Sequence, residues 1–497
     1  MKTMLTALYE QANLRPNAQA FCDTNETLTF SDVERIAESA GTALLRRGAR
    51  REAILILHER CAREIALFFA VWKAGCFYVP VDAEMGENRI RSILDRVKPR
   101  FAIADAGGRA LLEKYGFSGE LLDPDTLIET APDAQALDAV EAQTLDTDPT
   151  YLVFTSGSTG APKGVVGCHR AVVDYANQIS KTLRVDSTDV FAMQAPLYVD
   201  ACLKEILCAL MCGSSAVLVP KKLFMTPVPL VQFLNEHRVT ALCWVVPALT
   251  LISALHTFDE VVPQYLRTVA FGSEVFAPKQ LRIWQQHVPA RYINLYGPTE
   301  CTGMSCFYEV DRTFADGERI PIGRAFDNTE IFLLDENDRR ADEGEICIRG
   351  TALCHGYYRD PERTAKVFVP NPLNPDYPET IYRTGDLGRR NARGELEFLG
   401  RKDDQIKHMG HRIELGELEA AAKTVEGVDA ACAVFERERS ILGLVYTGSI
   451  ERAALLTALR AKVPEYLLPK MSRRVDALPL TQNGKTDRKA ATALLFG

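Results

Sequence analysis

Short apolar runs alternate with stretches of helical periodicity through most of the chain. The runs with strand character lie at 53–58, 77–81, 215–220 and 266–271. Between the first two runs, residues 62–73 carry apolar side chains at the spacing of a helix. Strands that alternate with helices in this way are typical of an α/β fold with largely parallel sheets.

The pattern changes after about residue 310. Three strand-like runs separated by polar turns follow, at 331–335, 344–349 and 394–399. Strands that follow one another with only polar turns between them predict a β-rich subdomain over about 310–400.

A polar segment at 400–405 precedes a third pattern. Beyond it, the runs at 415–424, 430–435 and 450–463 predict a short α+β module. We therefore expect an α/β fold whose large N-terminal domain of mixed sheets covers 1–400, a hinge at 401–404 and a small mobile α+β domain over 405–497.

Composition and charge exclude several classes of protein. Of 497 residues, 47% are hydrophobic and 25% charged, as in folded globular chains. The 58 basic and 66 acidic residues give a net charge of −8 without a basic stripe, which argues against nucleic acid as a partner. The first twenty residues or so lack a signal-peptide core, and no apolar run is long enough to span a bilayer. We expect a cytoplasmic protein that binds no membrane.

The thirteen cysteines predict no disulfide framework and no zinc site. No CxxC pair occurs, and many of the cysteines lie inside apolar runs. Such cysteines behave as small apolar side chains, and this usage fits a reducing compartment.

The segment 151–164 carries the clearest chemical signal. An apolar strand leads into a loop with three glycines, four hydroxyl residues and one lysine, Lys163. Glycine backbone N–H groups can surround phosphate oxygens, and hydroxyls add further donors. Because Gly164 follows Lys163, the loop is not a P-loop of the GxxxxGK[ST] kind. Taken alone, the loop fits a surface turn equally well.

Further segments give the loop a context. In chain order, the sequence at 28–33, 73–82, 151–164, 294–300, 382–386, 400–403, 410–417 and 479–485 resembles the core motifs of the adenylate-forming superfamily. That superfamily contains amino-acid adenylation domains, acyl-CoA synthetases and luciferases. The segments 73–82 (KAGCFYVPVD), 294–300 (NLYGPTE) and 479–485 (PLTQNGK) resemble the amino-acid adenylation branch of the nonribosomal peptide synthetase type. The chain is also similar to D-alanine–carrier protein ligases.

The resemblance implies two half-reactions with ATP and Mg²⁺. A carboxylate attacks the α-phosphate of ATP and gives an acyl-adenylate and pyrophosphate. The phosphopantetheine thiol of an acyl or peptidyl carrier protein then attacks the adenylate. Rotation of the small domain about Asp403 would separate the two steps.

The resemblance also assigns roles at the nucleotide. Glu300 would ligate Mg²⁺, which prefers carboxylates together with phosphate oxygens. Asp386 would accept the ribose hydroxyls, Tyr296 would lie against adenine, and Lys485 would sit between the substrate carboxylate and the α-phosphate. The catalytic residues implied are Thr299, Glu300 and Lys485. The nucleotide-binding residues implied are Thr155, Ser156, Gly157, Ser158, Thr159, Gly160, Lys163, Asn294, Tyr296, Gly297, Asp386 and Arg401.

Asp200 falls where amino-acid adenylation enzymes place the aspartate that binds the substrate α-ammonium group. A buried carboxylate facing an amine forms a charge-assisted hydrogen bond. The alternative is that Asp200 caps a helix that begins at Ala201. The resemblance lines the side-chain pocket with Ala201, Lys204, Trp244 or Val245, Val269, Phe271, Gly272, Leu295, Gly303 and Met304.

Lys204 is the unusual member of this pocket, because an unpaired lysine among apolar side chains is costly. Either the substrate carries an acidic or strongly polar side chain that pairs with Lys204, or Lys204 extends outward. In the second case Phe271 and Met304 would restrict the pocket to a small side chain.

The chain departs from the family pattern at 407–410, which reads Lys-His-Met-Gly where Lys-Ile-Arg-Gly is usual. The missing arginine removes any role of that position in thiolation or carrier docking. We expect a stand-alone monomeric ligase that uses its carrier protein in trans. Two other functions stay open, an acyl- or aryl-CoA synthetase and a catalytically silent binding protein of the same fold.

Overall fold

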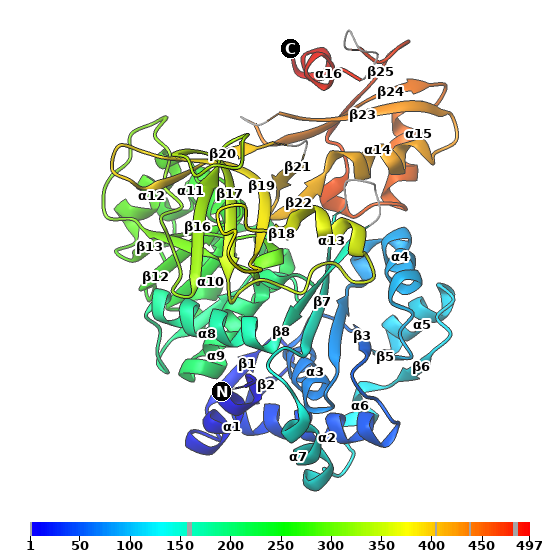
Figure 1. The fold of residues 1–497 in the computed structure, drawn as a ribbon, viewed down its shortest axis with the longest axis vertical. Coiled ribbons are helices and arrows are strands. Elements are labelled where there is room, and N and C mark those ends of the chain that lie inside the picture. Colours follow the sequence, from blue (N-terminus) through cyan, green and yellow to red (C-terminus); the bar gives the residue numbers. More distant parts are fainter. Residues whose placement is uncertain (1, 157–161, 403–404, 437–438, 481–485) are drawn as a thin grey trace.

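The computed structural model describes residues 2–156, 162–402, 405–436, 439–480 and 486–497. Its strands form five sheets within these residues, and helices cover the two largest (Figure 1). The predicted α/β class is confirmed.

The largest sheet is parallel in its centre and antiparallel at both edges. Its order is β15-β14-β13-β12-β11-β9-β10-β1-β2. The strands are β1 (Gln19–Cys22), β2 (Thr27–Thr29), β9 (Val190–Met193), β10 (Ser215–Leu218), β11 (Ala241–Val245), β12 (Thr268–Gly272), β13 (Arg291–Tyr296), β14 (Cys306–Glu309) and β15 (Arg324–Ala325).

A second sheet has the order β6-β5-β3-β4-β7-β8. All neighbours in it are parallel except the last pair, β7 and β8. The strands are β3 (Ala53–Leu57), β4 (Phe77–Val81), β5 (Phe101–Ala104), β6 (Glu120–Leu122), β7 (Pro149–Thr155) and β8 (Lys163–Cys168).

Helices join these two sheets through one apolar core. The core takes Phe21 and Ile293 from the first sheet, Ile54 and Tyr151 from the second, and side chains of the helices packed on them. The helices of this part are α1 (Leu5–Leu14), α2 (Phe30–Arg46), α3 (Ala62–Lys73), α4 (Glu87–Val97), α5 (Ala106–Lys114), α6 (Pro124–Ile128), α7 (Ala134–Gln143), α8 (His169–Leu183), α9 (Leu203–Cys212), α10 (Pro227–Glu236), α11 (Val246–Ala254) and α12 (Pro278–His287). The central strands of these sheets are covered on both faces, so neither face needs polar side chains. This explains the near-continuous apolar runs in the sequence.

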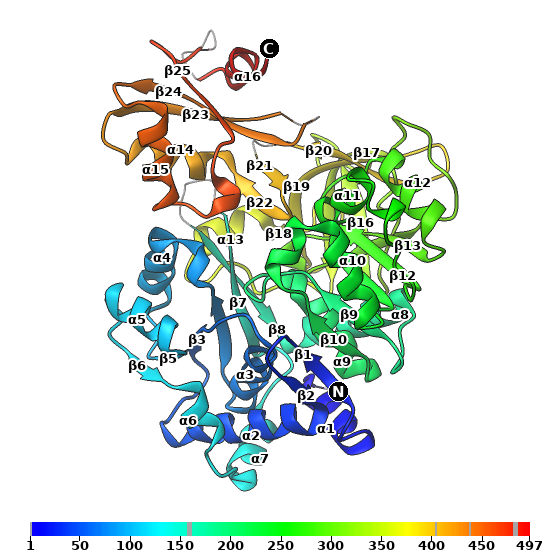
Figure 2. The ribbon, with the colours of Figure 1, turned by 180° about the vertical axis from the view of Figure 1, so that it is seen from behind.

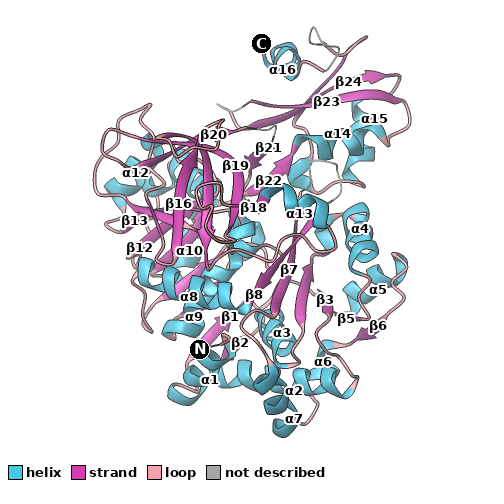
Figure 3. Ribbon diagram, in the orientation of Figure 1, coloured by secondary structure: helices cyan, strands magenta, loops and turns pink. Residues whose placement is uncertain are grey.

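The β-rich segment predicted over about 310–400 forms a sheet of its own (Figure 3). Its strands pair antiparallel, and they are β16 (Thr329–Leu334), β17 (Glu343–Gly350), β18 (Phe368–Pro370), β19 (Thr380–Arg390) and β20 (Leu396–Arg401). One helix, α13 (Pro361–Val367), leads into β18.

The C-terminal part begins with a hairpin and continues into a small sheet with its own core. The hairpin is β21 (Gln405–His408) and β22 (His411–Glu414), and the sheet is β23 (Val428–Glu436), β24 (Ile441–Gly448) and β25 (Met471–Arg474). The helices are α14 (Leu415–Lys423), α15 (Arg452–Arg460) and α16 (Arg488–Phe496). Figure 2 shows this sheet and α16 at the end of the molecule opposite the N-terminus, with the hairpin between them and the rest.

Several predicted elements have the expected bounds, and others differ by a few residues. The helix at 62–73 and the strand at 77–81 are confirmed as α3 and β4. The run at 266–271 forms β12, which is Thr268–Gly272, and Arg267 just before it lies at the surface and pairs with Asp189. All thirteen cysteines lie among the described residues, none is in a disulfide, and all but Cys61 and Cys212 are buried. None of the described helices combines the length and the apolar character that crossing a bilayer requires.

Candidate active site

A cavity of about 110 Å³, here the central cavity, lies where the C-terminal hairpin meets the rest of the molecule. It is enclosed by the end of β7, the segment before α9, the loop after β13, strands β19 and β20, and the β21–β22 hairpin. The residues on its wall that the argument uses are Thr155, Ser156, Asp200, Thr299, Asp386, Arg401, Lys407 and Arg412.

Asp386 and Arg401 form a buried ion pair on one side of the central cavity. They are register partners across β19 and β20, and 2.6 Å separates Asp386 Oδ1 from Arg401 Nη1. The Tyr296 hydroxyl donates to the other carboxylate oxygen at 2.6 Å. Because a carboxylate offers about four lone-pair sites, it can accept further hydroxyl donors while it keeps both partners. The predicted ribose acceptor and its neighbours Tyr296 and Arg401 are thus brought together.

Glu300 lies in the short 3₁₀ helix η5 (Thr299–Cys301) and is fully buried. Its Oε1 receives the Tyr357 hydroxyl at 2.7 Å and lies 3.1 Å from Lys163 Nζ, and its Oε2 lies 2.8 Å from Arg412 Nη1. Burial alone would raise the pKa of Glu300, but Arg412, Lys163 and the Tyr357 hydroxyl hold that pKa well below its ordinary value. The carboxylate is therefore ionised and paired with two cations.

The β21–β22 hairpin supplies the cationic face of the central cavity. Lys407 Nζ lies over the Tyr296 ring, 5.4 Å from its centroid, and burial lowers the pKa of Lys407. The backbone N–H of Gly410 donates to Glu274 Oε1 at 2.7 Å, and the Ser156 hydroxyl donates to the Arg412 carbonyl. These contacts hold the hairpin against the end of β7 and the loop after β12.

Asp200 opens the short 3₁₀ helix η2 (Asp200–Cys202) that leads into α9. Val199 occupies the N-cap position, and neither η2 nor α9 has a side-chain cap, so the capping alternative is wrong. Asp200 lines the central cavity, and its carboxylate accepts a hydrogen bond from Thr299. Burial raises the pKa of this carboxylate.

A second space of about 10 Å³, here the side cavity, adjoins the central one and shares Ala201, Ser273 and Met304 with it. It lies at the carboxyl ends of β9, β11, β12 and β13, the edge of a parallel sheet where ligands commonly bind. Lys204 reaches it from α9 with only 4% of its surface exposed, and Lys204 Nζ donates to the Ala201 carbonyl at 2.6 Å. The predicted members that line the side cavity are Ala201, Lys204, Trp244, Val245, Phe271, Gly272, Leu295 and Met304.

Three predicted site residues lie elsewhere among the described residues. Val269 shares a face of β12 with Phe271, but it lies two residues further from the carboxyl end of the strand, where it is buried in an apolar core. Gly303 lines the central cavity and not the side cavity. Asn294 donates its amide to the Pro321 carbonyl at 2.8 Å and holds a loop. Predicted residues outside the described part of the chain are Gly157, Ser158, Thr159, Gly160, Asp403 and Lys485.

The structure also adds residues that the sequence did not single out. Tyr357 and Arg412 complete the surroundings of Glu300, and Gln194, Ala195 and Cys243 line the side cavity. Arg412 had a signal, since it lies in the matched segment 410–417, whereas Tyr357 follows no recognisable motif.

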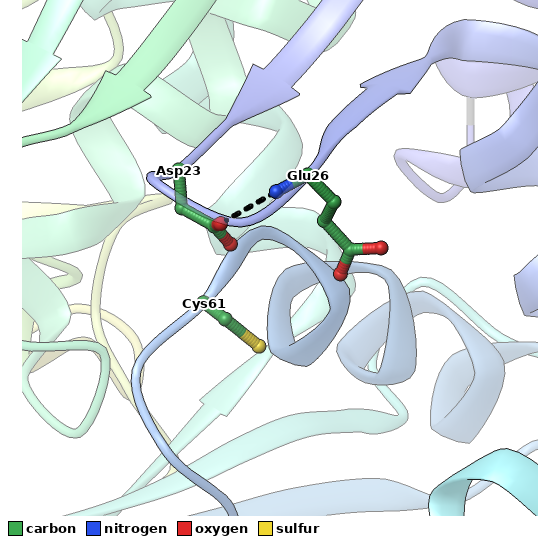
Figure 4. A group of neighbouring side chains, drawn as sticks. All are labelled: Asp23, Glu26 and Cys61. Carbon is green, nitrogen blue, oxygen red and sulfur yellow. Dashed lines mark hydrogen bonds between the residues drawn. The ribbon is translucent and has the colours of Figure 1, made fainter.

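Another group of side chains with metal-ligand chemistry is already satisfied by the protein. Asp23, Glu26 and Cys61 lie together at the start of α3 (Figure 4). Asp23 accepts backbone N–H groups of Glu26 and Ala62 at 3.0 and 2.7 Å, and Glu26 pairs with Arg63 at 2.9 Å. Burial raises the pKa of the Cys61 thiol to about 11. The group fixes a turn and a helix start.

Comparison with known proteins agrees with this arrangement. The family model described as "AMP-binding enzyme" matches residues 8–358. Tyrocidine synthase 1 of Brevibacillus parabrevis is 31% identical over 490 residues, which cover 97% of this chain and 44% of that protein. The crystal structure of IdnL1 superposes with a TM-score of 0.79 at 29% identity and covers 96% of this chain and 99% of that one. Holo-PA1221, a nonribosomal peptide synthetase protein with adenylation and PCP domains, gives 0.83 at 25% identity over 99% and 84%.

The chain belongs to the AMP-binding enzyme family, within the adenylate-forming superfamily. Within that superfamily it is of the nonribosomal peptide synthetase adenylation type. It spans less than half the length of tyrocidine synthase 1.

Members of this family use ATP, typically with Mg²⁺. The described residues fit the nucleotide, but in this arrangement they do not fit the metal ion. The Asp386 carboxylate retains acceptor sites for hydroxyl groups, and the buried Thr155 hydroxyl has no hydrogen-bond partner among the described residues. Both features suit a nucleotide. Glu300, in contrast, has both carboxylate oxygens engaged by cations, so in this arrangement it does not fit a metal ion.

Proposed function

We propose that this chain activates an amino acid as its aminoacyl-adenylate and passes the aminoacyl group to the phosphopantetheine thiol of a separate carrier protein. The observation that carries the proposal is the position of Asp200. It is a partly buried carboxylate on the wall of the cavity that the Asp386–Arg401 pair also lines.

In the first half-reaction, an oxygen of the substrate carboxylate attacks the α-phosphorus of ATP and the bond to pyrophosphate breaks. Asp386 and Arg401 would hold the ribose, while Thr155 and Ser156 would donate to phosphate oxygens. Such fixed donors stabilise charge that develops on the phosphate without reorganising at the moment of reaction. Lys485 would approach the reacting groups when the domain over 405–497 rotates about 401–404.

Asp200 supports an amino acid over a simple acyl substrate. Thr299 and the positive charge of Lys204 both favour the ionised form of Asp200, but burial still raises its pKa, so its charge is only partly compensated. An α-ammonium group at the central cavity would add a charge-assisted hydrogen bond, which a simple carboxylic acid cannot supply.

The side cavity supports a short substrate side chain that ends in a hydrogen-bond acceptor. Its volume of about 10 Å³ leaves little room beside Trp244, Phe271 and Met304. Lys204 Nζ has three N–H donors, of which one reaches the Ala201 carbonyl, so others are available to a ligand. A short acidic or polar amino acid meets both conditions.

The test is amino-acid-dependent pyrophosphate exchange across a panel of amino acids and simple carboxylic acids. Exchange that depends on the α-amino group, and that Asp200→Ala removes, supports the proposal. Exchange with deaminated acids followed by transfer to coenzyme A would instead establish an acyl-CoA synthetase. No exchange with any acid, while ATP still binds, would point to a silent binding protein.

The carrier step has its own test. Incubating the enzyme with ATP, substrate and a carrier protein that bears a free phosphopantetheine thiol should give AMP and an aminoacyl thioester on the carrier, detectable by mass spectrometry. A thioester that forms only on this chain itself would contradict transfer in trans.

A further inference from the structure

Glu300, the residue that the family motif assigns to the metal, is closed off by the C-terminal hairpin. It has no exposed surface, and its two oxygens are held by Lys163 and Tyr357 on one side and by Arg412 on the other. The Arg412 guanidinium thus occupies the position beside Oε2 from which a cation would have to approach.

Charge makes this arrangement incompatible with a metal ion at the same carboxylate. With Lys163 and Arg412 in place, one negative charge already faces two positive charges. A divalent cation added there would lie within a few ångströms of both in a buried setting, where like charges repel far more strongly than in water. Arg412 would have to leave first.

Arg412 is held through its side chain as well as its backbone. Its Nε donates to Gln405 on the paired strand, so the guanidinium is tied to the hairpin itself. The Arg412 carbonyl accepts from the Ser156 hydroxyl, and the Gly410 N–H donates to Glu274, so the hairpin is tied in turn to the rest of the molecule. Withdrawal of the hairpin would therefore carry Arg412 away from Glu300 together with Gln405.

We propose that Glu300 is an exchange site at which the Arg412 guanidinium and Mg²⁺ exclude one another. While the hairpin is docked, Arg412 keeps a metal ion away from Glu300, and a metal ion held at Glu300 would exclude the docked position of Arg412. Arg412 is in this sense a positioning residue, which acts on the substrate site through Glu300. The inference rests on the proposed function only for the role of Glu300 toward the metal.

A second interdomain contact provides a control, because it is independent of Glu300. Arg89 of α4 donates to Glu417 of α14 and to the Tyr466 hydroxyl, both at 3.3 Å. Removing Arg89 should loosen the same interface without changing which cation Glu300 prefers.

The first test measures metal affinity and does not depend on catalysis. Mn²⁺, which is followed by electron paramagnetic resonance, is titrated into the full chain with α,β-methylene-ATP. Arg412→Met should tighten Mn²⁺ binding by about tenfold or more, because the competing cation is gone, and Arg412→Lys should stay close to the unchanged protein. Equal or weaker binding by Arg412→Met would overturn the proposal.

The second test measures docking of the hairpin by hydrogen–deuterium exchange over 405–414. Mg²⁺ with α,β-methylene-ATP should speed exchange in the unchanged protein and in Arg89→Met, whereas in Arg412→Met exchange should be fast at the outset and insensitive to Mg²⁺. The proposal would also be overturned if hydrogen–deuterium exchange over 405–414 in the unchanged protein did not respond to Mg²⁺ at concentrations where Mn²⁺ binds. Neither readout needs an amino acid, so failure of the proposed function would show separately, as absent pyrophosphate exchange.

Discussion

Asp386 and Arg401 stand opposite one another across two antiparallel strands, with 2.6 Å between carboxylate and guanidinium and less than a tenth of either side chain exposed. Strand register alone sets their distance, so the pair exists before any ligand arrives. Because the pair is already formed, the Asp386 carboxylate faces the central cavity as a fixed hydrogen-bond acceptor. A ligand that binds there does not have to order this side chain.

Replacing Arg401 with Met should lower kcat/KM for ATP by about 100-fold or more. Removing one partner of a buried ion pair costs about 3–5 kcal/mol, because the other charge is left unpaired. Pyrophosphate exchange as a function of ATP concentration measures the effect. Arg389→Ala is the matched control, since Arg389 pairs with Glu397 across the same two strands at 47% exposure. Exposed pairs contribute about 0–1 kcal/mol, and a loss in the control as large as in Arg401→Met would remove the assigned role.

Replacing Asp200 with Ala should cost about 3–5 kcal/mol of binding for an amino acid, as for a broken buried charge pair. The loss should be much smaller for the corresponding acid without its amine. The measurement compares kcat/KM for the two substrates in both proteins. Equal losses would show that Asp200 is structural, and Thr299, which donates to it, would then be the group it positions.

The elements and the candidate site were predictable to different degrees. Apolar periodicity found β4 and α3 because each buries a continuous face. The motifs singled out Asp386 and Thr299, which line one cavity, because each lies in a contiguous segment whose wording carries the chemistry. Asp200 lines the same cavity, but it lies outside these segments and only its place relative to them pointed to it.

The surroundings of Glu300 were not predictable in the same way. Its partners Tyr357 and Arg412 lie 57 and 112 positions further along the chain. No local pattern encodes which strands close over which loop, and contacts between the hairpin and the rest depend on docking of two separately folded parts. Val269 was expected at the side cavity because it shares a face of β12 with Phe271, but the cavity lies at the carboxyl end of the strand and does not extend back to Val269.

Lys485→Ala should abolish formation of the adenylate while leaving ATP binding and the fold largely intact. A lysine between the substrate carboxylate and the α-phosphate would neutralise two anions that otherwise repel. Pyrophosphate exchange and circular dichroism measure the two properties. Thioester formation from adenylate prepared separately should survive, and near-normal exchange in the variant would exclude the role.

Glu205 predicts a pH dependence of stability. Both of its carboxylate oxygens are buried and have no side-chain hydrogen-bond partner among the described residues, and burial raises its pKa to about 7. The folded state therefore binds this proton more tightly than the unfolded state, so the stability it confers is full below about pH 4.5 and is lost as the pH rises toward 7. Two and a half pKa units correspond to about 3 kcal/mol. Glu205→Gln should raise the melting temperature at pH 8 and change it little at pH 5, and an equal shift at both pH values would contradict this account.

Lys204 provides the sharpest test of substrate choice. It is four residues after Asp200 and reaches the side cavity, while Asp200 lines the central one. If the substrate side chain is acidic, Lys204→Met should remove most activity toward it, because its carboxylate would be buried without a partner. Activity toward the amide and toward alanine should rise in relative terms.

The measurement is the ratio of kcat/KM for an acidic amino acid, its amide and alanine in the two proteins. Glu205→Gln serves as the matched control, since it removes the neighbouring buried charge on α9 without touching the cavity lining. If Lys204→Met leaves the three ratios unchanged, Lys204 is only the counter-ion that lowers the pKa of Asp200, and Phe271 and Met304 alone select the substrate by size.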